Sequence, residues 1–352
     1  MSKSIHCFKL PFKIKETLVK HRLAMSGDLS NLSIEQLSKI THLSLDECEE
    51  VVKVINNKES LYFDPASILL KRELAPGSTI PTLSAKLNNL LCDGFPLGRL
   101  CEIAGASGVG KTQICFQLCV TVQLPEDIGG LGADSLYIDV DNSFRFNRIA
   151  EISGFLREKT RNMIDFDEER ISEHIFVERC EELSHLQVLV LEKLEPFIKQ
   201  NPQVRLVIID SIAYLLRYDF KGKAEERNAL IWNMSNKLRE IAATYNLCVI
   251  VTNHVRYEPE SGKEKPALGN RWGHYCALRL FLEKHAESGV RVATLTKSVN
   301  QQEASIHFKI GPQGVYDAEE PIERATGSRN QDCHQEPLYT LFPYFRFPYL
   351  NF

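Results

Sequence analysis

Residues 105–112 have the types and the spacing of a phosphate-binding loop. The run fits the pattern G-x-x-x-x-G-K-[ST] at every fixed position, and it consists of Gly105, Ala106, Ser107, Gly108, Val109, Gly110, Lys111 and Thr112. Backbone N–H groups of such a loop surround nucleotide phosphates, the lysine reaches the β- and γ-phosphates, and the final hydroxyl holds Mg²⁺. The run therefore predicts binding of ATP and Mg²⁺, with Lys111 as a catalytic cation and Thr112 as a metal ligand.

The residues on either side support this interpretation. Residues 100–104 form a short apolar run typical of a buried strand, and residues 113–123 carry apolar side chains along one helical face. A strand, a glycine loop and a helix in this order aim backbone N–H groups and a helix N-terminus at phosphates. The alternative is a glycine turn that binds nothing, which would not require these flanking elements.

A magnesium site beside such a loop needs a second, acidic anchor. Residues 204–210 are a run of mostly β-branched and apolar residues that ends in Asp210. P-loop enzymes hold Mg²⁺ with an acidic residue in this setting, so Asp210 is predicted to bind the metal through a bound water. An aspartate that caps the following turn is the alternative.

Hydrolysis also needs a base that orients water. Asp141 follows a predicted strand at 136–139, and ligands of open α/β sheets sit at the carboxyl ends of the strands. Asp141 is the predicted base, and a plain helix-start role is the alternative. His254 follows a further predicted strand, at 248–252, and it either senses the γ-phosphate or simply closes that strand.

Two segments of mixed charge follow strand ends and are candidate DNA-facing loops. They span residues 217–227 and 254–270. Their predicted DNA contacts are Arg217, Lys221, Lys223, Arg227 and Arg256. Acidic residues in the same stretches nearly cancel this charge, so about three phosphate contacts would give a salt slope of only about −2 on single strands. A solvated loop of mixed charge is the alternative.

The composition is that of an ordinary globular protein. Of 352 residues, 43% are hydrophobic and 25% are charged, and the net charge of −4 provides no global basic field for nucleic acid. Among ten cysteines, Cys115 and Cys119 lie one helical turn apart, but a zinc site there would need two more ligands. We therefore expect buried free thiols in a reducing compartment. We expect neither a secretory signal nor a membrane span, because no long apolar run occurs.

Four segments differ in their pattern. Residues 1–58 show helical spacing of apolar residues and predict a small helical domain that either packs on a partner or contacts the DNA backbone. Residues 59–82 contain prolines and a glycine that break helix, and they predict a linker. Residues 83–318 are the predicted core. Residues 319–352 form a tail with seven aromatic residues in its last fourteen, which either packs on the core or docks a partner.

The core pattern predicts an α/β fold. Apolar strand runs alternate with helical runs as far as about residue 275, which is typical of a mostly parallel sheet between helices. Short strands follow at 278–282, 290–296 and 305–310, and they are expected to add an antiparallel edge.

Four sequence blocks, in order, resemble the RecA-type strand-exchange recombinase family. The blocks are residues 108–113, 137–144, 204–211 and 251–254. Within the family the chain is most similar to the eukaryotic recombinase paralogues, and it resembles the C-type paralogue best through two further stretches, 266–274 and 309–314. The resemblance covers about residues 10 to 318 and implies a RecA-like P-loop ATPase core with a small N-terminal helical domain.

The resemblance also implies roles by position. Asp141 stands where the family has its water-activating Glu, and Arg148 stands where a residue stacks on adenine. Phe63 and Ala66 match the linker motif that inserts into a neighbouring subunit, and Lys297 falls where the family places residues near a neighbour's nucleotide. The implied partners are sister recombinase paralogues, the main strand-exchange recombinase, and single-stranded or branched DNA.

Three departures from the family pattern bear on activity. The predicted base is Asp rather than Glu, which is one methylene shorter, and a misplacement of about 1 Å can cost about 10²-fold in rate. His254 replaces the usual Gln, and the second DNA loop is short and lacks the apolar insertion residue. Together they imply a weak DNA-dependent ATPase.

The leading hypothesis is therefore an ATP-binding paralogue that forms hetero-oligomers with sister paralogues. It would promote homologous recombination and double-strand break repair, mitotic or meiotic, in the nucleus, a location implied by the resemblance alone. The alternative is an autonomous filament-forming recombinase or a ring-shaped DNA motor of the same fold. A small-molecule kinase is a third and weaker hypothesis, because the sequence shows no arginine-rich lid segment.

Overall fold

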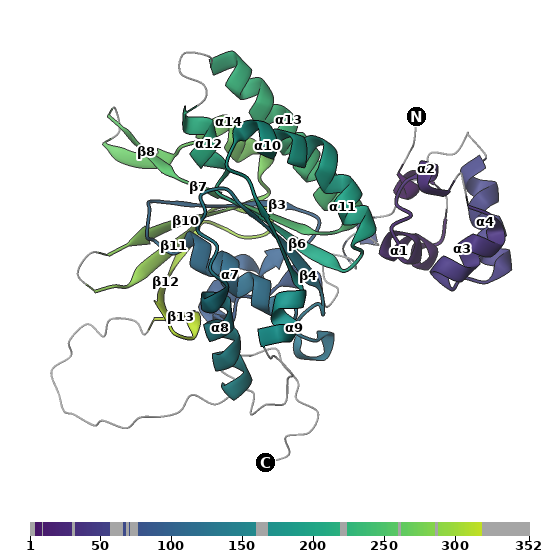
Figure 1. The fold of residues 1–352 in the computed structure, drawn as a ribbon, viewed down its shortest axis with the longest axis horizontal. Helices are drawn as coiled ribbons and strands as arrows, with labels where there is room; N and C mark the ends of the chain where they lie inside the picture. The colour runs from purple at the N-terminus through teal and green to yellow at the C-terminus, as the bar shows by residue number, and fades with distance from the viewer. Residues whose placement is uncertain are drawn as a thin grey trace.

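A nine-stranded sheet with helices on both faces forms the main body of the protein in this computed structural model (Figure 1). The structure describes residues 4–8, 10–29, 32–56, 66–67, 70, 77–159, 168–218, 224–259, 262–285 and 288–318. The predicted aromatic tail at 319–352, Phe63, Lys221 and Lys223 lie outside the described residues. Among the described helices, none has the length and apolar character needed to cross a membrane.

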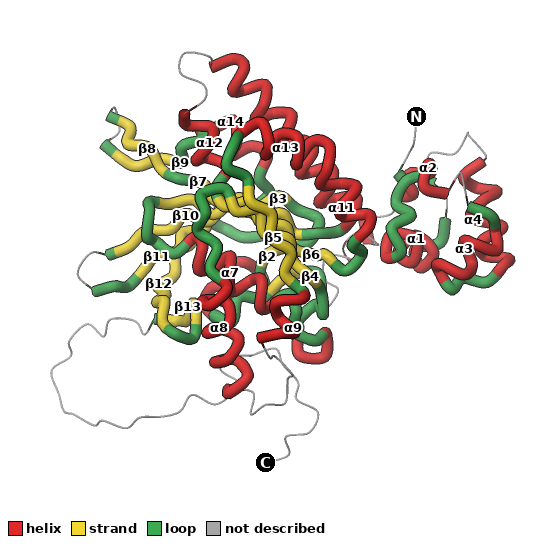
Figure 2. Tube along the Cα trace, viewed as in Figure 1, coloured by secondary structure: helices red, strands yellow, loops and turns green. Residues whose placement is uncertain are grey.

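Six strands pair in parallel, and the sequence pattern predicted all of them except the last to be parallel. They are β3 (Leu100–Gly105), β4 (Asp134–Asp139), β5 (Ile175–Arg179), β6 (Val204–Asp210), β7 (Cys248–Asn253) and β10 (Leu278–Lys284). The remaining strands of this sheet are β11 (Arg291–Lys297), β12 (Ala304–Gly311) and β13 (Gly314–Asp317). The spatial order is β13-β12-β11-β10-β3-β7-β6-β4-β5. Figure 2 shows these strands as one continuous twisted layer.

The antiparallel edge begins one strand later than the sequence predicts. β10 pairs in parallel with β3, and its Leu280 lies opposite Ile103. Antiparallel pairing starts between β10 and β11 and continues through β12 to β13. The prediction for residues 278–282 was therefore wrong in direction. The cause is α14 (Gly269–Tyr275), a helix that was not predicted from the sequence. It carries the chain back to the N-terminal end of β3, so β10 runs in the same direction as β3.

Two apolar layers cover the two faces of the sheet. Strand residues alternate between them, so Ile103, Ile208 and Ile250 belong to one cluster while Ile209 and Val249 belong to the other. The first layer is formed by α6 (Ala85–Leu91), α7 (Lys111–Thr121), α8 (Phe146–Lys159) and α9 (Glu168–Glu173). The second is formed by α10 (Leu183–Val188), α11 (Leu194–Gln200), α12 (Ile212–Tyr218), α13 (Ala224–Tyr245) and α14. This is the predicted sheet between helices.

Short elements complete the core. A π-helical turn at Leu189–Lys193 joins α10 to α11, so these three elements form one continuous helical segment. Two small ladders were not predicted: β1 (Thr79–Ile80) with β2 (Phe95–Pro96), and β8 (Val255–Glu258) with β9 (Lys263–Pro266).

The N-terminal residues form a small helical unit beside α11 (Figure 1). It contains α1 (Phe12–Lys20), α2 (Ser26–Leu29), α3 (Ile34–Thr41) and α4 (Leu45–Asn56) around its own apolar cluster. Ser33 and Gln36 form a capping box at the start of α3, with reciprocal hydrogen bonds of 2.9 and 3.1 Å. Arg22 donates to the backbone oxygen of Asn201, which ties this unit to the core. The predicted domain boundaries stay predictions.

A buried ion pair links three neighbouring strands at the centre of the sheet. Glu102 of β3 is fully buried and accepts from Arg279 of β10. Its other oxygen accepts from the side-chain amide of Asn253, on β7, at 2.7 Å. A buried carboxylate is tolerable only when it is paired and hydrogen-bonded, so this network fixes the order β10-β3-β7 beneath the phosphate loop.

We expect Arg279→Met to lower the free energy of unfolding by about 3–5 kcal/mol, because it leaves the Glu102 charge buried without a cation. Denaturant unfolding of the purified chain measures this loss. The matched control is the double variant Glu102→Gln with Arg279→Met, which removes the buried charge and keeps a hydrogen-bonding side chain for Asn253. This double variant should recover most of the lost free energy of unfolding. A loss below about 1 kcal/mol in the single variant would contradict the argument.

Candidate nucleotide site

The phosphate loop joins the buried end of β3 to the start of α7. Gly110 is the N-cap of α7 with φ of 114°, a left-handed conformation that favours glycine. A Cβ atom on Gly110 would lie 2.5 Å from the Cδ1 atom of Ile310, the end of a flexible side chain, so a side chain here would displace Ile310. Glycine is thus favoured here by its backbone conformation.

Lys111 is held inside the loop. Its side chain is 7% exposed, and its Nζ atom donates to the backbone oxygens of Gly105 at 2.9 Å and Ala106 at 2.8 Å. Burial lowers the pKa of Lys111, while the charges of Asp210 and Asp141 act in the opposite direction. The ammonium group therefore lies at the carboxyl edge of the sheet, within electrostatic reach of both predicted acidic residues.

Asp210 is the point where three elements meet. Its carboxylate is 1% exposed and accepts from the Thr112 hydroxyl at 2.6 Å and from the Tyr137 hydroxyl at 2.7 Å, both on the same oxygen. The other oxygen accepts from the Thr252 hydroxyl. Thr112 opens α7, Tyr137 lies in β4 and Thr252 lies in β7. The structure brings the predicted pair Thr112 and Asp210 together, and their hard oxygen atoms are the donors that Mg²⁺ prefers.

The sequence reasoning missed the parts that Tyr137 and Thr252 play. Both residues sit inside strand runs, where only the pairing of strands shows which side chains converge. Ile209 lies opposite Val251 and Asp139 lies opposite Asp210, so the last residues of β4, β6 and β7 are level with one another. Burial and the neighbouring Asp210 charge raise the pKa of Tyr137, which keeps its phenol protonated as a donor.

Asp141 lies on a short loop that a second aspartate shapes. Asp139, at the end of β4, is 1% exposed and accepts from the backbone N–H groups of Ser143 at 2.9 Å and Phe144 at 3.2 Å. This turn presents Asp141, whose Oδ1 atom is buried and has no hydrogen-bond partner among the described residues. The role of Asp139 was not predicted from the sequence, although an aspartate that binds backbone N–H groups a few residues on is a known turn signal.

Burial raises the pKa of Asp141 above its ordinary value, and the charges of Asp210 and Asp139 add to the shift. An acceptor oxygen that is buried, unpaired and desolvated has the properties required to orient a water molecule. The predicted alternative for Asp141, a helix-start role, receives no support from the geometry, because α8 begins only at Phe146.

Arg148 is fixed by partners from distant segments. Its Nε atom donates to Gln113 at 2.7 Å, and its Nη1 atom donates to Glu151 at 2.7 Å and to the backbone oxygen of Pro312 at 3.1 Å. A further bond reaches the backbone oxygen of Gly311. The guanidinium thus links the helix after the phosphate loop to the β12–β13 turn. The adenine contact of Arg148 stays a prediction.

The structure describes the side chains of only some of the predicted DNA-binding residues. Arg217 lies in α12, but the structure does not describe its side chain. Arg227 of α13 donates to the backbone oxygen of Ala267 at 3.4 Å, and burial together with the charge of Arg256 lowers its pKa. Arg227 and Arg256 thus lie in a helix and a strand, and not in loops as predicted, and the charge of Arg256 acts on Arg227. Lys265 pairs with Glu258 across the β8–β9 ladder, in line with the predicted near-cancellation of charge.

The other predicted residues are placed as follows. His254 is half-buried directly after β7, and its backbone oxygen accepts from Ala267 at 2.8 Å. Lys297 donates to the backbone oxygens of Gly273 at 2.9 Å and His274 at 3.3 Å, at the end of α14. Ala66 is helical and exposed. The roles of these residues stay predictions.

A phosphate loop after a central parallel strand, with a buried aspartate at the end of the next strand but one, defines a P-loop nucleotide-binding domain. Residues 77–318 match the family model for Rad51. The chain belongs to the Rad51 family, and its RecA-like core and the family resemblance of its four blocks are thereby confirmed. Members of this family are ATPases, and their cores use nucleotide and Mg²⁺.

Two curated proteins illustrate the similarity. The DNA repair protein RAD51 homolog 3 of Cricetulus griseus is 32% identical over 346 residues, which cover 90% of this chain and 93% of that protein. The DNA repair and recombination protein RadA of Cenarchaeum symbiosum (strain A) is 32% identical over 300 residues, or 82% of this chain and 72% of that protein.

The raised pKa of Asp141 predicts a pH-dependent effect on stability. The ionised carboxylate costs folding free energy at every pH above its folded-state pKa, and this cost disappears below the ordinary value of about 3.9, where both states are protonated. Asp141→Asn should therefore raise the free energy of unfolding near neutral pH, and the gain should shrink as the pH falls toward about 4. Denaturant unfolding at several pH values measures it.

The matched control is Asp127→Asn, which removes an exposed carboxylate elsewhere on the core. It should give no comparable gain. An Asp141→Asn variant that is no more stable than the wild type near neutral pH would contradict the burial argument.

Proposed function

We propose that this protein is an ATP-binding Rad51-family paralogue that promotes homologous recombination and double-strand break repair together with related paralogues. The family match and the two relatives, whose names describe DNA repair and recombination, support this proposal. The observation that carries the nucleotide part is the group of Lys111, Thr112, Asp141 and Asp210 at one sheet edge.

The proposed nucleotide chemistry uses the chain's own residues in distinct roles. Residues 105–112 would bind the phosphates through backbone N–H groups, and Lys111 would leave its bonds to the loop oxygens to contact the β- and γ-phosphates. Thr112 and Asp210 would hold Mg²⁺, which neutralises charge on the phosphates when bound. Asp141 would orient the attacking water, His254 would sense the γ-phosphate, and Arg148 would pack against adenine.

Hydrolysis is proposed to be slow and dependent on DNA. The Asp141 side chain is shorter than the glutamate of the family pattern, so its carboxylate reaches less far toward the γ-phosphate. The Arg227 and Arg256 pair supports a DNA contact, because two cations that repel each other gain from a phosphate placed between them. Arg217, Lys221 and Lys223 are proposed to extend this contact.

Assembly with sister paralogues and with the main strand-exchange recombinase is also part of the proposal, as is a nuclear location. The relative's name as a DNA repair protein supports a role in the nucleus. Phe63 and Ala66 are proposed to dock on a neighbouring subunit, with residues 1–58 and 83–318 as domains joined by the linker 59–82. The proposed repair role applies to DNA double-strand breaks in mitotic or in meiotic cells.

We expect Asp141→Glu to raise the rate of ATP hydrolysis in the presence of single-stranded DNA, by up to about 10²-fold if the shorter side chain alone limits the rate. A phosphate-release assay on the purified chain measures this change. Lys111→Ala, which removes the phosphate contact, is the negative control. An unchanged or lower rate in Asp141→Glu would count against the shortened base.

The partner proposal predicts a nucleotide-dependent complex. Affinity purification of the tagged chain from nuclear extract should recover sister paralogues with the wild type, and Lys111→Ala should change their yield. Sedimentation of the purified chain with ATP and single-stranded DNA tests the alternative. Recovery of the chain alone, in large self-assemblies, would favour an autonomous filament or a ring-shaped motor instead.

A further inference from the structure

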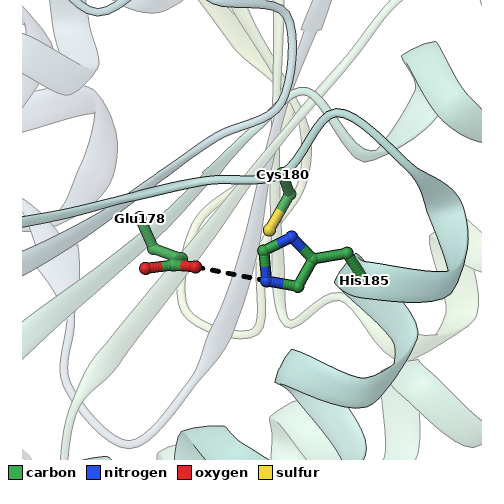
Figure 3. Close-up of side chains that lie close together, drawn as sticks. All are labelled: Glu178, Cys180 and His185. Carbon is green, nitrogen blue, oxygen red and sulfur yellow. Dashed lines mark ion pairs between the residues drawn. The ribbon is translucent and has the colours of Figure 1, made fainter.

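A cluster of metal-ligating side chains lies at the free edge of the sheet, apart from the nucleotide site. It consists of Glu178 at the end of β5, Cys180 just after that strand, and His185 in the first turn of α10. One ligand atom from each residue lies within 4.8 Å of the others. Figure 3 shows the carboxylate of Glu178 and the thiol of Cys180 both directed toward the imidazole ring of His185. No other such group of three occurs in the described part of the chain.

We propose that Glu178, Cys180 and His185 form a zinc site. Thiolate, imidazole and carboxylate are the three ligand types that zinc takes, and three protein ligands with a fourth, open position is an established zinc arrangement. A thiolate together with an imidazole favours zinc over Mg²⁺ or Ca²⁺, which prefer oxygen ligands. The site is separate from the phosphate loop and does not depend on the proposed function.

The geometry needs little adjustment to bind a metal ion. The Nε2 atom of His185 already lies 3.2 Å from Oε1 of Glu178. Zinc–ligand bonds of about 2.0–2.3 Å put the ligands of a tetrahedral site about 3.3–3.8 Å apart. Because all three ligand atoms lie within 4.8 Å of one another, a side-chain movement of about 1 Å closes the cluster around an ion.

The backbone around the cluster is anchored, whereas two of its ligands face solvent. Cys180 is fully buried, and it packs in the same apolar cluster as Leu183 and Leu186 of α10. The side chains of His185 and Glu178 are 46% and 44% exposed, which gives an ion a path of entry and leaves one coordination position for water. A rigid thiol with two accessible ligands is thus positioned before the metal arrives.

Binding requires the Cys180 thiol to lose its proton to solvent, because the thiolate is the metal ligand. Burial raises the pKa of Cys180 to about 11, so without a metal the group stays a thiol. A bound cation supplies the opposite charge that stabilises the thiolate.

The site would also brace the loop that carries Asp141. The backbone N–H of Cys180 donates to the backbone oxygen of Asp139 at 2.9 Å, and the Asp139 carboxylate holds the turn at Ser143 and Phe144. A metal that joins β5 to α10 would thereby stiffen the strand end next to the predicted base.

The test is a titration of the full chain with Co²⁺, after treatment with a chelator and without nucleotide. A thiolate–cobalt absorption band that saturates at one ion per chain, and that Zn²⁺ displaces, is expected for the wild type. Cys180→Ser should abolish the band. Mutation of a residue that only hydrogen-bonds to a metal ligand typically lowers metal affinity by about 10–100-fold. Loss of a ligand itself, in His185→Ala or Glu178→Gln, should therefore weaken cobalt binding by at least about 100-fold.

Two matched variants serve as controls. His174 pairs with Asp134 at 2.6 Å and has a similar exposure of 43%, but it is not part of a three-ligand cluster, so His174→Ala should bind cobalt like the wild type. Cys92 is an exposed thiol on another element, and Cys92→Ser should also bind normally. Zn²⁺ should raise the melting temperature of the wild type and of His174→Ala but not that of His185→Ala.

The half-exposed His185 makes the test decisive even if the buried Cys180→Ser variant does not fold. A wild-type chain that gives no thiolate–cobalt band would overturn the proposal. So would a band of unchanged affinity in His185→Ala, since the cluster would then be a surface ion pair beside an inert buried cysteine.

Discussion

The buried carboxylate of Asp210 is the interaction on which the nucleotide site depends. A charged group with 1% exposure is stable only where hydrogen bonds replace its lost water, and here three hydroxyl groups do so. They come from the start of α7, from β4 and from β7. The same bonds therefore fix the phosphate loop against the ends of two strands, and they place the Thr112 hydroxyl within 2.6 Å of the carboxylate.

A second aspartate performs a related task on the neighbouring strand. Asp139 lies level with Asp210 in the sheet and directs the following turn through two backbone N–H groups. The result is an Asp141 oxygen that is buried without a partner. The Asp139 carboxylate thus shapes the turn, while the Asp141 carboxylate keeps one oxygen without a partner at the same edge. This division of roles is expected where a site must bind and also act on a ligand.

The Glu178, Cys180 and His185 cluster adds a further group of polar side chains, at the end of the outermost strand, β5. β5 has one neighbour in the described sheet, β4, so its other edge makes no hydrogen bonds to a further described strand. A cation at the turn from β5 into α10 would link the two elements where hydrogen bonding in the sheet ends. The bond from Cys180 to Asp139 joins this edge to the loop of the predicted base.

The local features of this protein were predictable from its sequence. The phosphate loop and the strand that ends in Asp210 depend on residues close together in the chain, and local pattern was sufficient to predict them. The alternation of strands and helices was enough to predict a mostly parallel sheet between two helical layers.

Contacts between distant residues depend on the packing of the whole fold. The parallel pairing of β10 with β3 depends on α14, which has no strong periodicity of its own, and the hydroxyl groups around Asp210 become neighbours only through the register of the strands. Arg148 contacts Gln113 across 35 positions and Gly311 across 163. Such contacts leave no periodic signal in the sequence, because the partners lie in different elements and come together only when the whole chain has folded.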